Sequence, residues 1–200
     1  MAGLLTAAVP GAAQRPDLFG DLYARGMAKQ KIMKSLRGKF TETTTSTLLT
    51  KPIVARGTVI AAAPARVRMV YTEPEAKTLT MDGKALTIVW PARNERQQID
   101  VGETQKRIDQ YFTGASIKDL QSMFEIAARP DPAMRDHDLV DMKPKRKQIA
   151  QGLSRLEIWI DRRSDLLTQM RMTFPGGDQK TLTLEDLEVN YPVTDALFKQ

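Results

Sequence analysis

The sequence predicts a mainly β fold of the α+β class, with about ten antiparallel strands, an N-terminal helix and a short helical insertion. Three observations lead to this prediction. Short runs of alternating polar and apolar residues recur, turn residues separate these runs, and two stretches have apolar residues at helical spacing. The chain of 200 residues is 42% hydrophobic and 27% charged, which is typical of a globular protein that can bury one core.

The N-terminal helix is predicted over Asp17 to Leu36, where apolar residues return at roughly helical spacing among Lys, Arg and Asp. Asp17 can cap its start, and Gly26 weakens its middle. We therefore expect one amphipathic helix at the start of the fold.

The first thirteen residues are small and apolar, and Gly11 and Ala13 are spaced like a signal-peptidase site before Gln14. A basic segment in front of the apolar stretch is missing. We expect residues 1–13 to be the remnant of an export signal, or else a disordered start, and residues 14–200 to form one domain.

Strands follow the helix. The first six are predicted over residues 39–45, 54–63, 66–71, 77–81, 85–90 and 96–101. In the third of them Arg66 and Arg68 alternate with Val67, Met69 and Tyr71, so one face of the strand is wet and the other is dry. Asp82-Gly83 is a two-residue signal for a hairpin between the fourth and fifth strands.

The helical insertion is predicted over Glu103–Phe112 and Ser116–Phe124, with Ser116 as an N-cap. Ile117, Leu120 and Phe124 fall on one stripe of the second helix. A loop at Arg129–Pro132 and four more strands complete the fold, over residues 139–143, 153–160, 166–174 and 180–190. Hairpin turns are predicted at Asp161–Asp165 and Pro175–Asp178. Strands of this number and length form a sandwich or a barrel.

Composition excludes several kinds of site. The chain has no Cys, which rules out thiolate catalysis, disulfides and an N-terminal lipidated Cys, and no apolar stretch is long enough to span a membrane. The formal charge of +6 permits anionic partners. The densest basic run, Lys143–Lys147, has no aromatic residue within it, so we interpret it as a solvated loop and expect no nucleic acid partner.

Candidates for catalysis are few, and we predict no enzyme activity, no cofactor and no metal. The single imidazole, His137, lies between Asp136 and Asp138 in a polar segment that we expect to be solvated. Gly102 and Gly114 are isolated, so no glycine-rich phosphate loop is present. A Ser–His–Asp triad remains open, because triads assemble in space, although no Ser lies in a nucleophile-elbow sequence.

The dry face of the sheet leaves two alternatives. Apolar side chains can fill the interior as a packed core, or leave a cavity beneath the helices for one small ligand. The 10 Met residues suit both, because Met fills irregular cores and also lines surfaces that adapt to apolar partners. Periodicity does not decide between a core and a cavity.

The order of several motifs resembles the LolA family of periplasmic outer-membrane lipoprotein carriers. One group of motifs comprises Gly57-Thr-Val59, Pro64, the alternating Val67, Met69 and Tyr71, Pro74, Asp82-Gly83-Lys84, Leu86 and Pro91. The other comprises Leu156-Glu-Ile158-Trp-Ile160-Asp161, Thr181-Leu-Thr-Leu184, Asn190 and Asp195-Ala196-Leu197-Phe198. The resemblance covers Leu18 to Phe198, nearly the whole chain.

This resemblance implies an unclosed antiparallel barrel whose apolar concave face is lidded by helices. It implies a soluble, monomeric periplasmic carrier that binds acylated lipoprotein or another lipid, with an inner-membrane ATP-driven exporter as donor and an outer-membrane receptor as acceptor. The residues expected to line its cavity are Val67, Met69, Tyr71, Leu79, Met81, Leu86, Ile88, Leu120, Phe124, Met170 and Met172.

The sequence departs from the family at a position of functional interest. The family often has an Arg before the strand-ending Pro, where it pairs with the lid; here Ala63 precedes Pro64, so this latch is absent or relocated to Arg66 or Arg68. The lack of a lipidated Cys argues against the membrane-anchored receptor form of the fold. Two other hypotheses remain beside the carrier: a lipid-sensing adaptor of the cell envelope with the same fold, and an enzyme of unrecognised type.

Overall fold

The computed structural model describes residues 17–102 and 115–199, whose strands all belong to one antiparallel sheet of eleven. The spatial order is β6-β5-β4-β3-β2-β1-β11-β10-β9-β8-β7, so β6 and β7 are the two edges and the sheet is not closed. The strands are β1 Ser35–Thr45, β2 Ile53–Ala62, β3 Arg66–Glu73, β4 Lys77–Met81, β5 Ala85–Trp90, β6 Glu95–Asp100, β7 Phe124–Pro130, β8 His137–Pro144, β9 Arg155–Asp161, β10 Leu167–Thr173 and β11 Gln179–Val189. This confirms the predicted fold class and the unclosed sheet.

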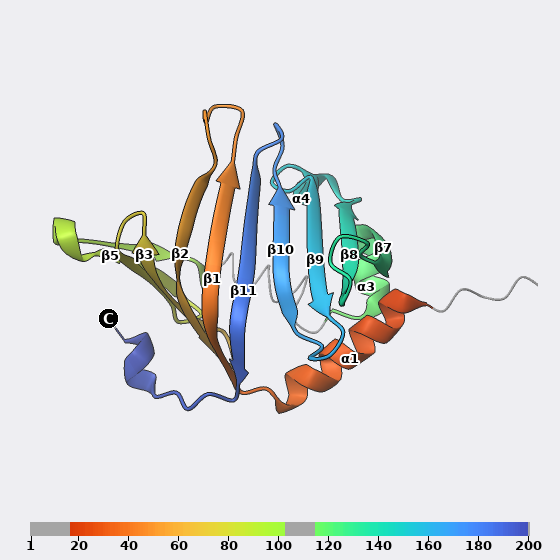
Figure 1. Cartoon of the computed structure of the whole chain (residues 1–200), viewed down its shortest axis with the longest axis horizontal. Coiled ribbons are helices and arrows are strands. Elements are labelled where there is room, and N and C mark those ends of the chain that lie inside the picture. The colour runs from red at the N-terminus through yellow and green to blue at the C-terminus, as the bar shows by residue number, and fades with distance from the viewer. Residues whose placement is uncertain (1–16, 103–114, 200) are drawn as a thin grey trace, which may run out of the picture.

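Short helices accompany the sheet: α1 Leu18–Ile32, α3 Ile117–Met123, α4 Lys147–Ala150, and the 3-10 turns η1 Pro91–Arg93 and η2 Asp195–Phe198. In Figure 1 both edges of the sheet curl away from the viewer, and α1 crosses the lower ends of β8 and β9. We call the face against which α1 and α3 pack the inner face, and the opposite one the outer face.

Local sequence explains the helix ends. The Asp17 carboxylate accepts the backbone N–H of Gly20 at 3.1 Å and caps α1. Ser116 and Asp119 form a capping box at the start of α3, as predicted from Ser116. The α1 helix is shorter than predicted, because Ser35 and Leu36 already pair with β2 and belong to β1.

One strand, β7, is not predicted by the sequence. β7 begins at Phe124 directly after α3, with no turn residue between them, so Phe124 is both the C-cap of α3 and the first residue of an edge strand. The predicted loop at Arg129–Pro132 therefore starts inside β7. The predicted helix over residues 103–112 and the predicted export-signal remnant over residues 1–13 lie outside the described residues.

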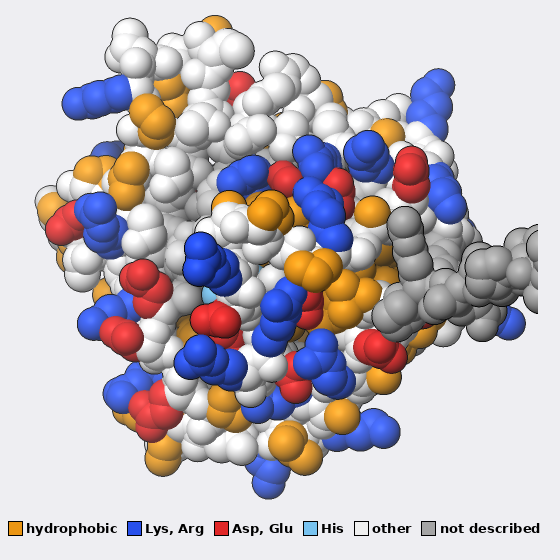
Figure 2. All heavy atoms as spheres, turned by 45° about the vertical axis from the view of Figure 1, so that its right-hand side comes forward, with side chains coloured by type: hydrophobic (Ala, Val, Ile, Leu, Met, Phe, Trp, Pro, Cys, Tyr) orange, Lys and Arg blue, Asp and Glu red, His pale blue; other side chains and the backbone are white. Residues whose placement is uncertain are grey.

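The charged residues of the basic run are exposed, as expected of a solvated segment, but the run is not a loop, because Lys143 and Pro144 belong to β8 and Lys147 begins α4. The Lys145 ammonium donates to the carbonyl of Gln121 at 2.7 Å, and Arg146 donates to the Ser122 hydroxyl at 3.2 Å. Cations near a helix C-terminus compensate its unpaired carbonyls. In Figure 2 Lys and Arg side chains alternate with Asp and Glu over the visible face and form no continuous basic patch.

Buried side chains gather into two clusters on the inner face. The helix-covered cluster consists of Leu22, Ala115, Leu120, Met123, Phe124, Val140, Met142 and Leu156. The strand cluster consists of Phe40, Ala55, Val59 and Tyr71, with Val67, Met69, Leu79, Leu182 and Leu184 packed against it. Within the described ranges, no helix is both long and apolar enough to cross a membrane.

Candidate ligand-binding face

Strand pairing aligns the apolar side chains of β2 to β5 on one face. Residues directly opposite each other in antiparallel strands point to the same side of the sheet. Met69 lies opposite Val59 and Leu79, and Leu79 lies opposite Ile88. The same register continues through β1 and β11 to β10, β9 and β8, as the opposed pairs Phe40–Leu184, Leu182–Met170, Met170–Ile158 and Ile158–Val140 show. The inner face is therefore an apolar surface that runs nearly from one edge of the sheet to the other.

The structure places the predicted cavity residues on this face or on the helix that packs against it. Those on β3, β4 and β5 are Val67, Met69, Tyr71, Leu79, Met81, Leu86 and Ile88; those on β10 are Met170 and Met172; Leu120 lies on α3 and Phe124 on β7. Tyr71, Leu120 and Phe124 are buried, whereas the others are partly exposed. The partly exposed residues are the ones that a ligand could reach.

A pocket of about 240 Å³ opens between α1 and the inner faces of β8 and β9. Its lining residues are Phe19, Leu22, Tyr23, Gly26, Met27, Leu120, Val140, Met142, Ile158 and Ile160. Every side chain in this lining is apolar or aromatic, so the pocket offers burial with few hydrogen-bonding groups. Such a lining suits a hydrocarbon chain.

Of these lining residues, the sequence predicts only Leu120 as part of the cavity. The α1 residues were missed because helical spacing shows which side of a helix is apolar and not which strand it meets. Ile158 and Ile160 were recognised as one face of a strand, but nothing in the sequence places that face below α1. The apolar spacing of α1 together with the alternation in β9 was the only available signal.

Ionic contacts fasten α1 to the sheet. The Arg25 guanidinium lies 2.7 Å from the carboxylate of Asp165 in the β9–β10 turn and 3.9 Å from that of Asp138 on β8. Asp138 is buried and also accepts two N–H groups of Arg162, at 2.9 Å and 2.7 Å. The Tyr23 hydroxyl donates to the carbonyl of Ala115 at 2.9 Å, so α1 is also tied to the start of α3.

The latch is not relocated to Arg66 or Arg68, which corrects the sequence-based expectation. Both side chains point to the outer face, where Arg66 pairs with Asp195 at 2.6 Å and lies over the ring of Phe198. Arg68 donates to the carbonyl of Leu197 at 2.7 Å. These arginines hold η2 against β3, and the arginine that reaches from a helix to the sheet is Arg25.

The strand cluster depends on one glycine. A Cβ added to Gly57 would stand 1.9 Å from the carbonyl oxygen of Val70 and 2.9 Å from the ring of Phe40. Because Gly57 has no side chain, the rings of Phe40 and Tyr71 meet edge to face with centroids 4.8 Å apart. The Tyr71 hydroxyl thereby comes within 3.4 Å of the Glu42 carboxylate.

Burial, followed by the charge of Glu42, raises the pKa of Tyr71 to about 12. The phenol therefore stays protonated well above neutral pH and can donate a hydrogen bond. Glu42 also accepts from the Lys180 ammonium at 3.2 Å. Three polar side chains, those of Tyr71, Glu42 and Lys180, thus contact one another within the apolar inner face.

The structure separates His137 from its acidic neighbour. His137 opens β8 opposite Asp161 and is half-buried, whereas Asp138 points the other way and is buried among arginines. This corrects the expectation that both are solvated. Among the described residues, no three His, Asp or Glu side chains are grouped so that they could hold a metal ion.

Solved structures show the same fold at low identity. The Mycobacterium tuberculosis lipoprotein LppX is 13% identical with a TM-score of 0.57, over 87% of this chain and 96% of that one. An uncharacterized conserved protein from Thermus thermophilus is 11% identical with a TM-score of 0.56, over 91% and 93%. The Pseudomonas aeruginosa MucA/MucB complex matches at 12% identity and a TM-score of 0.55, over 90% of this chain and 61% of the matched chain.

The sequence matches no curated protein. Residues 31–200 match the family model described as the outer membrane lipoprotein carrier protein LolA. This match extends from the end of α1 through all the strands of the sheet; it includes the strand cluster and every residue of the helix-covered cluster except Leu22. The chain therefore belongs to the LolA family of outer membrane lipoprotein carrier proteins.

Proposed function

We propose that this protein is a soluble periplasmic carrier that shields the acyl chains of lipoproteins on its inner face. In this proposal it accepts them from an ATP-driven exporter of the inner membrane and delivers them to a receptor at the outer membrane. The observation that supports it best is the apolar pocket of about 240 Å³ between α1 and β8–β9, which continues into the apolar inner face.

The physical reason is the cost of moving hydrocarbon through water. Each buried CH₂ gains about 0.8 kcal/mol, so a carrier must offer a dry surface as long as the chain that it holds. Release must also be possible. Apolar side chains such as Met27, Met142 and Ile158 provide burial without directional bonds. The partly exposed ion pair between Arg25 and Asp165, which helps to hold α1 over them, is of modest strength.

Mass spectrometry of the lipids that co-purify with the protein from a periplasmic extract tests this function. We expect acyl-containing ligands in near-stoichiometric amounts, and displacement of a fluorescent fatty acid from the purified protein by lipoprotein-derived acyl peptide. A protein that carries no acyl ligand and binds no fatty-acid probe would contradict the carrier.

A second function, a lipid-sensing adaptor of the cell envelope, is favoured by the likeness to the MucA/MucB complex. In that case the inner face would bind lipid as a signal, and a protein partner would bind elsewhere. Purification from the periplasm distinguishes the two: an adaptor would retain a stoichiometric regulatory protein whose release depends on added lipid, whereas a carrier would exchange its lipid with membranes.

A further inference from the structure

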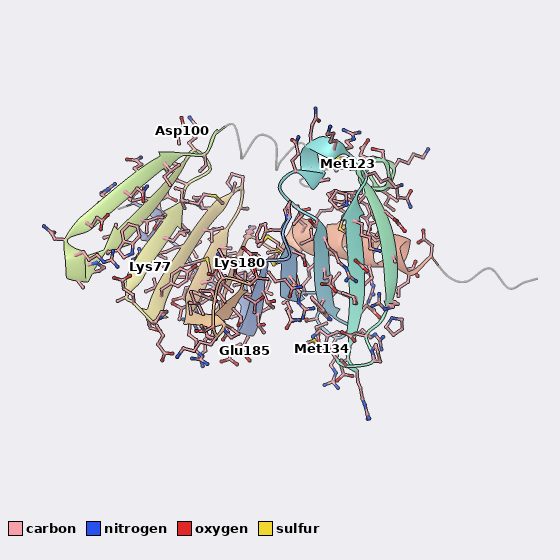
Figure 3. The ribbon with its side chains drawn as sticks, turned by 90° about the horizontal axis from the view of Figure 1, so that it is seen from above. Lys77, Asp100, Met123, Met134, Lys180 and Glu185 are labelled. Atoms are coloured by element: carbon pink, nitrogen blue, oxygen red, sulfur yellow. The ribbon has the colours of Figure 1, made fainter. Side chains whose placement is uncertain are left out.

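Four side chains form a line of polar contacts across the otherwise apolar inner face, and we call it the polar strip. It consists of Lys77 on β4, Tyr71 on β3, Glu42 on β1 and Lys180 on β11. The Lys77 ammonium lies 4.5 Å from the centre of the Tyr71 ring, Tyr71 reaches Glu42 at 3.4 Å, and Lys180 reaches Glu42 at 3.2 Å. Figure 3 labels Lys77 and Lys180, which come from the separate strands β4 and β11.

The register places this strip on the ligand-binding side. Lys180 lies directly opposite Met172, Glu42 lies opposite Leu182, and Lys77 lies opposite Tyr71. Gly57 of β2 lies opposite both Tyr71 and Phe40, so no side chain of β2 stands between the tyrosine ring and β1, which carries Glu42. The strip is therefore part of the inner face and ends the apolar stretch of β10 and β11.

Placing charge here has a cost that the rest of the face avoids. The Glu42 side chain is only 19% exposed, and a carboxylate taken from water needs compensating donors. Lys180 and Tyr71 supply two donors to it. The balance of the strip remains positive, since two ammonium groups accompany one carboxylate.

From this arrangement we infer that the polar strip binds the anionic head of an amphiphile whose hydrocarbon chain lies on the apolar inner face. This rests on the proposed binding of hydrocarbon chains on the inner face and adds a further ligand class beside lipoprotein acyl chains: an amphiphile with a free carboxylate or phosphate at its head. The Lys180 ammonium has three N–H donors and Glu42 occupies one of them, so it can pair with an anionic oxygen without losing Glu42. A cationic head would be repelled by both lysines.

The test compares ligands that differ only in the head group. A fluorescent probe is displaced with one of three ligands of equal chain length: palmitate, hexadecanol or a lysophosphatidic acid. The same assay is run on the wild type and on the variants K180M, K77M and K39M. Lys39 is the matched control, because it pairs with Asp186 on the outer face. We expect K180M to bind the anionic ligands about tenfold more weakly, a loss of about 1.4 kcal/mol. Hexadecanol binding should stay the same, and K39M should behave as the wild type.

Two further measurements separate the loss of the Lys180 charge from a loss of folding. K180R, which retains the charge, should preserve the preference for anions even if K180M folds poorly, and added salt should weaken palmitate binding to the wild type while leaving hexadecanol unchanged. Comparing palmitate with lysophosphatidic acid shows whether the anion is a carboxylate, a phosphate or either. Equal binding of palmitate and hexadecanol, unaffected by K180M and salt, would overturn the head-group site but leave acyl binding intact; a wild type that binds neither would overturn both.

Discussion

The two clusters of the inner face share one sheet and one kind of side chain, yet they are built differently. The helix-covered cluster joins strands β7 to β9 with residues of α1 and α3, whereas every member of the strand cluster lies on a strand. Met142 in the first is 4% exposed, while Met69 beside the second is partly exposed. The same alternating pattern thus produces a packed core at one end of the sheet and a reachable apolar surface at the other.

The difference shows what the helices contribute. A sheet face alone can supply an apolar floor, and a second layer turns that floor into a core. Where α1 meets β8 and β9 the second layer does not fill all the space, and the apolar pocket remains. Placing the same charge in each cluster should therefore have different consequences.

The largest effect is expected for Met142→Glu in the helix-covered cluster. Met142 lies between Ile126 and Leu156 of the neighbouring strands, and its side chain is buried. An unpaired carboxylate there should lower the free energy of unfolding by at least about 3 kcal/mol, a large part of a domain's stability. Urea denaturation followed by circular dichroism measures this loss. A stable Met142→Glu protein would show that water in the pocket below α1, which Met142 also lines, can hydrate the new carboxylate.

Met69→Glu makes the same change beside the strand cluster. If this surface is a ligand floor, water can reach the new carboxylate and the protein should remain folded, while the acyl chain loses dry contact area. We expect fatty-acid binding to weaken at least tenfold, or about 1.4 kcal/mol, in a fluorescent displacement assay. Unfolding of this variant at the level of Met142→Glu would favour a packed core here too.

Arg25→Met tests the attachment of α1 above the helix-covered cluster. The change removes the pairs with Asp165 and Asp138, although Arg162 still neutralises Asp138. Because the Arg25 side chain is 40% exposed, we expect a cost of no more than about 1 kcal/mol. Hydrogen exchange should quicken in α1 and bound probe should dissociate faster. Arg163→Met, at a pair that is far more exposed, is the control, and unchanged exchange in α1 would remove Arg25 as its anchor.

The sequence predicts the strands of the sheet better than it predicts the helix-covered pocket. Alternation predicted nearly every strand, since strict period-two patterns such as Arg66–Tyr71 depend only on the two faces of a sheet. It missed β7, where the helix passes into the strand at Phe124 without a turn residue. The predicted cavity residues that lie on strands do share one face, but the α1 side of the pocket depends on how a helix docks, which local spacing does not encode.

The polar strip could not be predicted from the sequence. Glu42 stands in a run of threonines and Lys180 follows a turn, so each is ordinary in sequence. Only the register of β1 against β11, set over a sequence separation of more than a hundred residues, brings them to 3.2 Å. Long-range pairing is the information that a single sequence does not display.

The smallest effect is expected at His137. This residue lies on the outer face, away from both clusters, so its substitution serves as a reference for the variants of the inner face. Its backbone N–H donates to the carbonyl of Met134 at 2.9 Å, a bond that alanine keeps. His137→Ala should therefore change the free energy of unfolding by no more than about 0.5 kcal/mol and leave acyl binding unaltered.

The adjacent Asp138 is the matched comparison, because it points to the inner face and accepts hydrogen bonds from Arg162. Asp138→Asn should lower the free energy of unfolding by about 1–3 kcal/mol. Thermal unfolding of the two variants compares neighbouring residues on opposite faces. A larger loss for His137→Ala, or loss of a bound metal with it, would show that the outer face holds a functional site and that the division between the faces is wrong.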